Sequence, residues 1–229
     1  MPSSLGAHLE RRRITSPGMI IRGGTFGPVA TNTSVVADRR GGRALVVDPA
    51  MGSAAWVGET LARLDAEPVA VLDTHGHWDH VVENHLWSDR GLPVWVGAGD
   101  EDWLRAPAPF NPALFGYPPP TPGVEPARVL SDGDEVEVGD LRLRLLATPG
   151  HSPGCMVAYA EAEGEALVGD LIFAQGIGRT DFPGSDHAAM MRSLERLFDE
   201  IPADVRIYPG HGPWAVPLKE AEPWARMFM

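Results

Sequence analysis

Thr74-His75-Gly76-His77-Trp78-Asp79-His80 places three histidines and a carboxylate within seven residues. Imidazole and carboxylate groups are the side chains that bind Zn²⁺ and related divalent ions. The hydrophobic run Val69-Ala70-Val71-Leu72 leads directly into this stretch and predicts a buried strand. We therefore expect the histidine-rich stretch to form a loop at the end of a strand, which is a common position for an active site.

The spacing within the loop predicts which of its side chains can bind the same metal ion. Alternate side chains of an extended chain point the same way, so His75 and His77 can bind one ion. Asp79 and His80 are neighbours and would diverge if the strand continued, so they serve a second ion only if the chain turns there. Gly76 loosens the backbone, and a helical pattern follows the loop. The simpler alternative is a surface loop that is histidine-rich by chance.

Three further residues of the same chemistry follow predicted strands. His151 comes after the strand-like run 141–146, Asp170 ends the hydrophobic run 166–170, and His211 follows the apolar segment 205–208. Taken singly, each has an ordinary alternative: His151 and His211 as turn residues, and Asp170 as the cap of the next segment. Because all three stand at strand ends, we interpret them as partners of the histidine-rich loop.

In the order H-x-H-x-D-H, then His, then Asp, then His, the chain resembles the metallo-β-lactamase fold superfamily from about residue 20 to residue 211. The resemblance implies an α/β fold, a four-layer αβ/βα sandwich with metals along one edge between two sheets. It also implies a ligand set in which Asp170 bridges two ions, one bound by His75, His77 and His151 and the other by Asp79, His80 and His211.

This ligand set implies hydrolysis. Two divalent ions about 3.5–4 Å apart can share a water and lower its pKa from near 15.7 toward 7. One ion also polarises a substrate carbonyl and stabilises the oxyanion. We therefore predict two divalent cofactors, zinc first and iron or manganese as alternatives, with Asp79 and Asp170 as the catalytic carboxylates. No serine or cysteine nucleophile is required, so Ser152 is predicted as a turn residue and Cys155 as a core residue.

A second motif narrows the resemblance. Gly178-Arg179-Thr180-Asp181-Phe182 looks like the G-R-T-D-F motif of short glyoxalase II-like hydrolases and of persulfide dioxygenases. Trp78 within the histidine-rich loop resembles the glyoxalase II-like hydrolases more than the persulfide dioxygenases. Secreted metallo-β-lactamases typically lack a bridging aspartate and carry a signal peptide, so Asp170 and the N-terminal sequence argue against that activity. The resemblance thus implies the glyoxalase II-like, or hydroxyacylglutathione hydrolase-like, subgroup.

The expected reaction is the hydrolysis of a small-molecule thioester, an S-2-hydroxyacyl-thiol, by a metal-bound hydroxide. Only 18 residues follow His211, and the glutathione anchors of the helical extension of typical eukaryotic glyoxalase II have no match among them. The thiol half is therefore glutathione, another low-molecular-weight thiol such as mycothiol, or coenzyme A. The first alternative is a mononuclear iron persulfide dioxygenase, the second is a lactonase, and a non-enzymatic binding module is a distant third.

Other residues are predicted to support the ligands or contact the substrate. Asp73, directly before the loop, is predicted to hydrogen-bond a ligand histidine, with a plain turn role as the alternative. Arg179 and Asp181 form either a buried pair behind the ligands or substrate contacts, since arginine is a good carboxylate anchor. The proline-rich segment 106–122 is neither helix nor inner strand. Its aromatic residues Phe110 and Tyr117 either pack on their own sheet or form a wall over the site.

Composition agrees with one domain over residues 18–229 after a weakly ordered segment, 1–17. The chain of 229 residues is 44% hydrophobic and 22% charged, as is usual for globular proteins. Its net charge of −12 argues against nucleic-acid binding. There is no apolar run of membrane-spanning length, and no apolar signal region is visible. The single cysteine fits a reducing compartment, so we expect a cytoplasmic protein. The sequence does not predict its oligomeric state.

Periodicity and turn residues predict the elements. Strands are expected at 19–22, 33–37, 44–47, 69–72, 93–96, 128–130, 135–138, 141–146, 156–159, 166–168 and 205–208. Helices are expected over 53–64, with Ser53 as the cap, over a short stretch ending near Trp87, and over 186–201. The apolar tail 223–229 is expected to pack on the protein or on another subunit.

Overall fold

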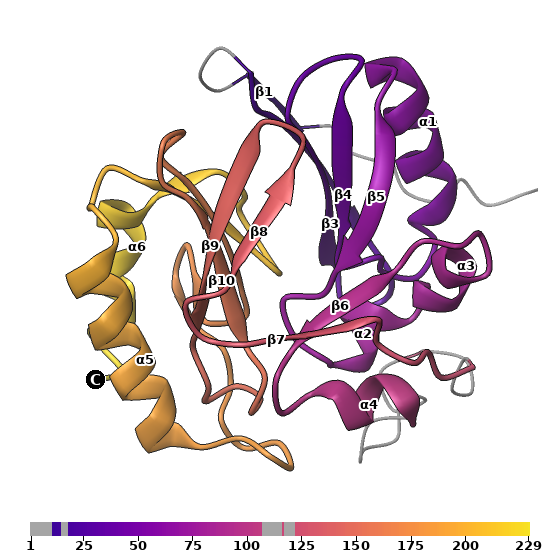
Figure 1. Cartoon of the computed structure of the whole chain (residues 1–229). Helices are drawn as coiled ribbons and strands as arrows, with labels where there is room; N and C mark the ends of the chain where they lie inside the picture. The colour runs from indigo at the N-terminus through magenta and orange to yellow at the C-terminus, as the bar shows by residue number, and fades with distance from the viewer. Residues whose placement is uncertain (1–10, 15–17, 107–115, 117–121) are drawn as a thin grey trace, which may run out of the picture.

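The computed structural model describes residues 11–14, 18–106, 116 and 122–229. Two β-sheets face one another, with α1 and α3 outside the first and α5 and α6 outside the second (Figure 1). The predicted fold class, a four-layer αβ/βα sandwich, is confirmed. Each sheet buries both faces, one against the other sheet and one under helices, which explains the long hydrophobic runs in the sequence.

The first sheet contains seven strands in the order of the sequence. They are β1 (Arg11–Ile14), β2 (Ile20–Phe26), β3 (Thr31–Ala37), β4 (Arg43–Val47), β5 (Glu67–Leu72), β6 (Val94–Gly97) and β7 (Arg128–Leu130). Strands β1 to β4 are antiparallel, and β4 to β7 are parallel. The parallel strands therefore end at one edge, where the loop after β5 begins.

The second sheet has six strands in the order β15-β14-β11-β10-β9-β8. Their bounds are Glu135–Val138 for β8, Leu141–Ala147 for β9, Met156–Ala160 for β10, Glu165–Gly169 for β11, Arg206–Pro209 for β14 and Val216–Pro217 for β15. The short hairpin of β12 (Ile172–Phe173) and β13 (Gly176–Ile177) follows β11. Because β11 and β14 are parallel, the loops that follow them leave the sheet at the same end.

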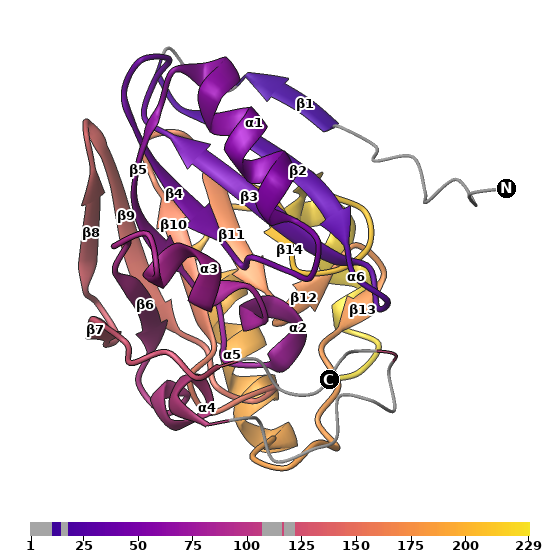
Figure 2. The ribbon, with the colours of Figure 1, turned by 90° about the vertical axis from the view of Figure 1, so that its right-hand side faces the viewer.

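The helices are α1 (Ala54–Leu64), α2 (Trp78–Val81), α3 (Asn84–Ser88), α4 (Glu101–Arg105), α5 (His187–Glu200) and α6 (Leu218–Ala225). The apolar face of α1 carries Val57, Leu61 and Leu64, which belong to the core between this helix and the first sheet. In α5, Met190, Leu194 and Leu197 pack in the same way on the second sheet. Figure 2 shows α2 at the end of the molecule where the β12–β13 hairpin also lies.

Strand β1 was not predicted: Arg11–Ile14 pairs with the edge of β2, which offers backbone groups to a further strand. The predicted cap of α1 is wrong. The side chain of Ser53 does not cap α1. Instead, the Glu83 carboxylate accepts hydrogen bonds from the backbone N–H groups of Gly52 (2.5 Å) and Ala54 (2.8 Å).

Short elements were not predicted, because too few residues repeat for a period to show. These are α4, α6, β12, β13 and β15. Within the described part of the chain, every helix is too short or too polar to cross a bilayer. The tail after α6 leaves Met227 and Phe228 exposed in this single chain.

Candidate metal centre

All seven predicted ligands lie at one edge of the sandwich, and each follows or ends a strand. Four come from the loop after β5 and the start of α2, and the others come from the loop after β9, the end of β11 and the loop after β14. The first sheet thus supplies His75, His77, Asp79 and His80, and the second supplies His151, Asp170 and His211. Residues distant in sequence meet because the two sheets end side by side.

The first group consists of three buried histidines. His77 Nδ1 lies 3.0 Å from His75 Nε2 and 2.8 Å from His151 Nε2. Zinc–nitrogen bonds of 2.0–2.1 Å at tetrahedral angles separate neighbouring ligand atoms by roughly 3.3 Å. The two separations are a few tenths of an ångström shorter than this value, and the three nitrogens lie close enough together to bind one divalent ion.

The second group consists of Asp79, His80 and His211. His80 Nε2 lies 3.3 Å from His211 Nε2, and Asp79 Oδ2 lies 3.4 Å and 3.2 Å from these two nitrogens. The required turn of the chain is α2, which begins at Trp78 and directs Asp79 and His80 away from the line of His75 and His77. This group also fits a divalent ion.

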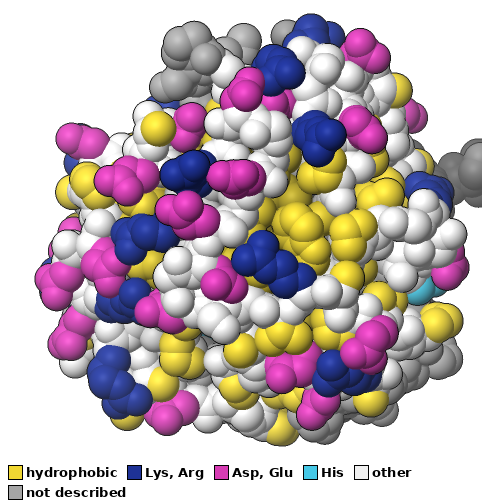
Figure 3. All heavy atoms as spheres, in the orientation of Figure 1, with side chains coloured by type: hydrophobic (Ala, Val, Ile, Leu, Met, Phe, Trp, Pro, Cys, Tyr) yellow, Lys and Arg dark blue, Asp and Glu magenta, His cyan; other side chains and the backbone are white. Residues whose placement is uncertain are grey.

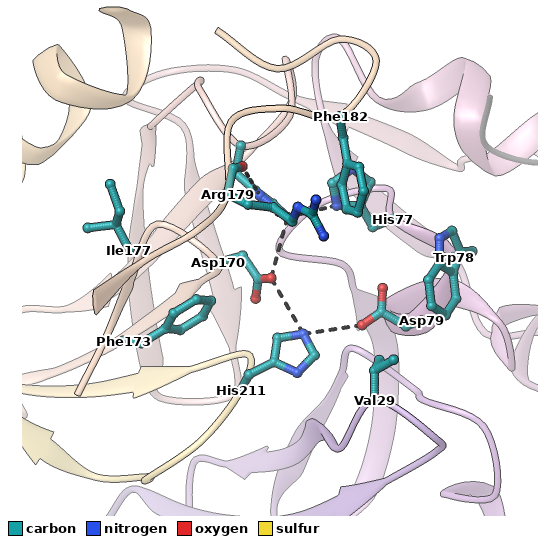
Figure 4. Close-up of a pocket in the computed structure, with 11 residues that line it drawn as sticks. Val29, His77, Trp78, Asp79, Asp170, Phe173, Ile177, Arg179, Phe182 and His211 are labelled. Atoms are coloured by element: carbon teal, nitrogen blue, oxygen red, sulfur yellow. Dashed lines mark hydrogen bonds and ion pairs between the residues drawn. The ribbon is translucent and has the colours of Figure 1, made fainter. Parts of the chain in front are cut away.

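Asp170 lies between the groups. Its Oδ2 is 3.4 Å from His151 Nε2 and 3.5 Å from His211 Nε2, and a dashed line in Figure 4 marks the contact with His211. Its Oδ1 is 3.5 Å from His80 Nε2. One carboxylate therefore faces both histidine clusters. This is the position that a bridging ligand requires.

Asp48, at the end of β4, orients one histidine of each group. His80 Nδ1 donates to Asp48 Oδ2 at 2.9 Å, which directs His80 Nε2 into the centre. The hydroxyl of Thr74 donates to the same oxygen at 2.7 Å and lies 3.2 Å from His75 Nδ1. Sequence reasoning missed Asp48, although a carboxylate directly after a hydrophobic strand was the signal that identified Asp170.

Two other ligands have partners outside the centre. His151 Nδ1 donates to the carbonyl oxygen of Arg179 at 2.7 Å, which leaves its Nε2 for an ion. The hydroxyl of Thr31 donates to Asp79 Oδ2 at 2.8 Å. Such contacts hold ligand orientation and typically change metal affinity 10–100-fold when they are removed.

The prediction that Asp73 supports a ligand histidine is wrong. Its side chain is buried and accepts a hydrogen bond of 2.7 Å from Asn84 Nδ2, at the start of α3. No hydrogen bond joins it to a ligand histidine among the described residues. The reason is direction: the carboxylate of Asp73 is aimed at α3, and that of Asp48 at the centre.

The electrostatics of the two groups differ. Burial and the neighbouring histidines hold the pKa values of His75 and His77 well below the ordinary value, so these rings are neutral and offer lone pairs. Burial also disfavours a charge on His80, but Asp79, Asp48 and Asp170 outweigh burial and raise its pKa to about 10. An ion entering the second group therefore replaces a proton on His80.

A pocket of about 280 Å³ opens beside the centre (Figure 4). Besides ligands, it is lined by Val29, Trp78, Phe173, Ile177, Arg179 and Phe182. The arrangement suits a ligand with an apolar part lying next to the metal positions. Val29, Phe173 and Ile177 were not predicted, because single apolar residues in short elements carry no sequence signal.

Arg179 and Asp181 form a pair, but the predicted burial of that pair is wrong. Arg179 Nε and Nη2 donate to the two carboxylate oxygens of Asp181, each at 2.6 Å, and the two side chains are 52% and 66% exposed. The guanidinium also lies 4.0 Å from the ring centre of Phe182. It is the backbone of Arg179, through its carbonyl, that contacts a ligand. Phe110 and Tyr117 lie outside the described residues.

Cys155 is a buried core residue, as predicted, and burial raises the pKa of its thiol. A protonated, enclosed thiol is a poor nucleophile. The buried hydroxyl of Ser152 has a carboxylate and this thiol as its partners. The chemistry of the centre therefore depends on the histidine and aspartate groups.

Residues 26–211 match the family model of the metallo-beta-lactamase superfamily, and the chain belongs to that superfamily. Its members are generally metal-dependent hydrolases. An uncharacterized protein of Aquifex aeolicus is 34% identical over 200 residues, covering 84% of this chain and 90% of the relative. The match to the superfamily therefore covers most of the chain and includes all seven candidate ligands.

Two named relatives represent different reactions. Hydroxyacylglutathione hydrolase GloC of Haemophilus influenzae is 29% identical, with 74% of this chain and 80% of GloC covered. The human mitochondrial persulfide dioxygenase ETHE1 is 27% identical, with coverage of 81% and 66%. The relatives of this chain thus include both a hydroxyacylglutathione hydrolase and a persulfide dioxygenase.

Solved structures agree with the fold. The BLEG-1 B3 metallo-beta-lactamase aligns with a TM-score of 0.80 at 28% identity, covering 88% of this chain and 95% of that chain. The di-iron-bound form of TTHA1623 aligns with a TM-score of 0.71 at 30% identity, covering 86% and 94%. One of these similar structures therefore holds two iron ions.

Proposed function

We propose that this protein is a binuclear metallohydrolase of the glyoxalase II type that cleaves an S-2-hydroxyacyl thioester. The observation that carries the proposal is the second ligand group: the ligand atoms of Asp79, His80 and His211 lie 3.2–3.4 Å from one another, and Asp170 lies between the two groups. Similarity to a hydroxyacylglutathione hydrolase supports the substrate class.

Two bound divalent ions would lower the pKa of a shared water and polarise the thioester carbonyl. The chain's own residues prepare that chemistry. Asp48, Thr31 and the Arg179 carbonyl hold the ligands in orientation, which reduces the reorganisation needed during the reaction. Asp79 and Asp170 supply two negative charges, which would offset half of the charge of two dications.

The pocket supports a substrate with an apolar acyl part and an anionic thiol part. Phe173 and Ile177 line one side, and Arg179 is the one Arg or Lys among the described residues that line it. Its guanidinium is half exposed, so it can exchange Asp181 for a substrate carboxylate at little cost. We propose that Arg179 binds the thiol half of the substrate. This role fits glutathione and other thiols that carry an anionic group.

A mononuclear iron persulfide dioxygenase is the second candidate, favoured by the similarity to ETHE1. The two candidates differ in the use of Asp79 and His211. A binuclear hydrolase needs them for its second ion, whereas a one-iron dioxygenase needs only a trio around His75, His151 and Asp170.

The test is Asp79→Ala and, separately, His211→Ala. We expect the metal content, measured by mass spectrometry, to fall from two toward one per chain. Hydrolysis of S-lactoylglutathione or the matching mycothiol and coenzyme A thioesters should fall about 10²-fold, or roughly 2.7 kcal/mol of transition-state stabilisation. Asp204→Ala, a surface carboxylate paired with Lys219, is the control and should change neither quantity.

Oxygen uptake with glutathione persulfide separates the candidates. If the Asp79 and His211 variants keep one iron and consume oxygen as fast as the parent protein, the dioxygenase replaces the hydrolase. A β-lactam substrate belongs in the hydrolysis assay beside the thioesters, because a B3 metallo-beta-lactamase shares the fold. Turnover of that substrate faster than of every thioester would also contradict the proposal.

A further inference from the structure

Asp100, the residue before α4, connects two loops that carry metal ligands. Its Oδ2 accepts hydrogen bonds from the backbone N–H of Gly76 at 2.7 Å and from the hydroxyl of Ser152 at 2.6 Å. Its Oδ1 accepts from the backbone N–H of Gly154 at 2.7 Å. Gly76 lies between His75 and His77, and Ser152 directly follows His151, so one carboxylate contacts the chain beside every ligand of the first group.

The packing around Asp100 is tight. A Cβ atom at Gly76 would lie 2.9 Å from Asp100 Cβ, and one at Gly154 would lie 2.6 Å from Asp100 Cγ. Both distances are shorter than Cβ contacts in folded proteins, so the loops approach the carboxylate this closely only with glycine at both positions. The three hydrogen bonds are consequently held by backbone geometry.

The chemistry of position 100 requires a carboxylate. All three partners of Asp100 are donors, and its side chain is fully buried. An amide in its place has one acceptor oxygen and an NH₂ group that would face a donor. A buried donor left without an acceptor costs on the order of 1–3 kcal/mol, and the loops would separate to relieve it.

We infer that Asp100 is a positioning residue for the three-histidine metal group: it holds the His75–His77 loop and the His151 loop in register so that their three nitrogens converge. Asp100 makes no hydrogen bond to a ligand side chain in the described structure and does not line the pocket. The inference concerns metal binding alone, so it does not depend on whether the protein is a hydrolase or a dioxygenase.

The experiment measures cobalt binding in the His211→Ala background, where the three-histidine group is the intact one. Co²⁺ is titrated into metal-free protein against a competing chelator, and its visible d–d absorption reports the coordination. Adding Asp100→Asn should lower Co²⁺ affinity 10–100-fold, the range usual for contacts behind metal ligands, and should change the absorption spectrum.

Asp38→Asn in the same background is the matched control. Asp38 is also a buried carboxylate that joins two loops, accepting from the backbone N–H groups of Arg43 at 2.7 Å and Asp140 at 3.1 Å, but it contacts no loop that carries a ligand. It should lower the melting temperature and leave the cobalt affinity within threefold of the background. An equal loss of affinity in both variants would show a general stability effect and overturn the inference.

Ser152→Ala removes one of the three hydrogen bonds and keeps the carboxylate. It decides the question if Asp100→Asn does not fold, as judged by circular dichroism. We expect a several-fold loss of Co²⁺ affinity in the His211→Ala background. Unchanged affinity and an unchanged spectrum in a folded Asp100→Asn or Ser152→Ala variant would overturn the inference.

Discussion

At the scale of single residues, the centre is ordered by acceptors that lie behind the ligands. Asp48 accepts a hydrogen bond from His80 and is linked to His75 through the hydroxyl of Thr74. One side chain therefore sets the ring orientation of a histidine in each group. The Arg179 carbonyl does the same for His151. His77 differs from the other ligand histidines because it presents Nδ1, and its ring stacks on Trp103 with centroids 5.3 Å apart.

Replacing Asp48 tests this arrangement against its neighbour Asp73. Asp48→Asn should lower the affinity of the centre for Zn²⁺ by 10–100-fold. An amide that keeps its oxygen for His80 and the Thr74 hydroxyl turns its NH₂ group toward the backbone N–H of Thr74, which the second carboxylate oxygen accepts at 2.7 Å. Asp73→Asn, equally buried but bound to Asn84, should change the affinity less than threefold. Competitive chelator titrations measure both, and a larger loss with Asp73→Asn would contradict the assignment.

At the scale of elements, short turns and helix ends decide where the side chains point. The single turn of α2 divides H-x-H-x-D-H into two ligand groups. The start of α1 is bound to Glu83, which lies between α2 and α3, so the helix on the outer face is tied to the metal loop. Ion pairs fasten other elements, and acidic and basic side chains lie next to one another over the face shown in Figure 3.

Glu83→Ala should lower the free energy of unfolding by about 1–2 kcal/mol, the usual contribution of a helix cap. The backbone N–H groups of Gly52 and Ala54 would lose their acceptor. The control is Glu59→Ala on the same helix, which breaks an exposed pair with Arg63 and should change stability by no more than about 0.5 kcal/mol. Urea denaturation of both variants measures the difference, and equal effects would refute the capping role.

Arg196 attaches α5 to the second sheet and should do so in a pH-dependent way. Its guanidinium lies 2.6 Å from both Asp132 and Glu200. The hydrogen bond from Arg196 lowers the pKa of Asp132, and those from Arg144 and then Arg196 lower that of Glu200. Carboxylates with depressed pKa values stabilise the fold above their unfolded values of about 4 and lose this contribution as the pH falls below them.

We therefore expect Arg196→Met to destabilise the metal-free protein by about 1 kcal/mol at pH 7, because the pairs are partly exposed. The difference from the parent protein should shrink toward zero below about pH 4. Thermal unfolding at several pH values, with chelator present throughout, checks this. A difference that stays constant or grows in acid would show that packing, not charge, dominates.

At the scale of the whole molecule, the metal centre joins the two halves of the sandwich. The loop after β5 belongs to the first sheet, whereas His151, Asp170 and His211 follow strands of the second sheet. Each ligand group contains residues from both sheets. Bound ions would therefore act as cross-links between sheets that otherwise meet through their apolar core, which includes Leu45, Leu72 and Leu143.

Removing metal should lower the melting temperature markedly. One ion present at 1,000 times its dissociation constant stabilises the folded state by about 4.1 kcal/mol, so even a single occupied site corresponds to roughly 8–16 °C for a chain of this size. Scanning calorimetry with excess Zn²⁺ and with chelator measures the shift. His151→Ala, which removes a second-sheet ligand, should show a smaller shift. Equal melting temperatures with and without metal would contradict the cross-linking role.

The amino-acid sequence was enough to predict seven candidate ligands, the superfamily and most long elements. His75, His77, Asp79 and His80 are close in the chain, and His151, Asp170 and His211 each stand at the end of a recognisable hydrophobic run. Strand ends are local features, and β-strands of a buried sheet carry a strong apolar signal. In the folded protein all seven side chains lie at one edge of the sandwich.

The residues that support the candidate ligands became visible only once the two sheets were packed together. Asp48 and not Asp73 orients His80 across 32 residues of sequence, and Asp100 reaches Gly154 across 54. The sequence also did not predict which ring nitrogen His77 directs at the centre. Nor did it predict that the Arg179–Asp181 pair is exposed. The reason is physical: periodicity records which side of an element is buried, whereas a hydrogen bond between distant loops depends on how two sheets pack and on the exact direction of each side chain.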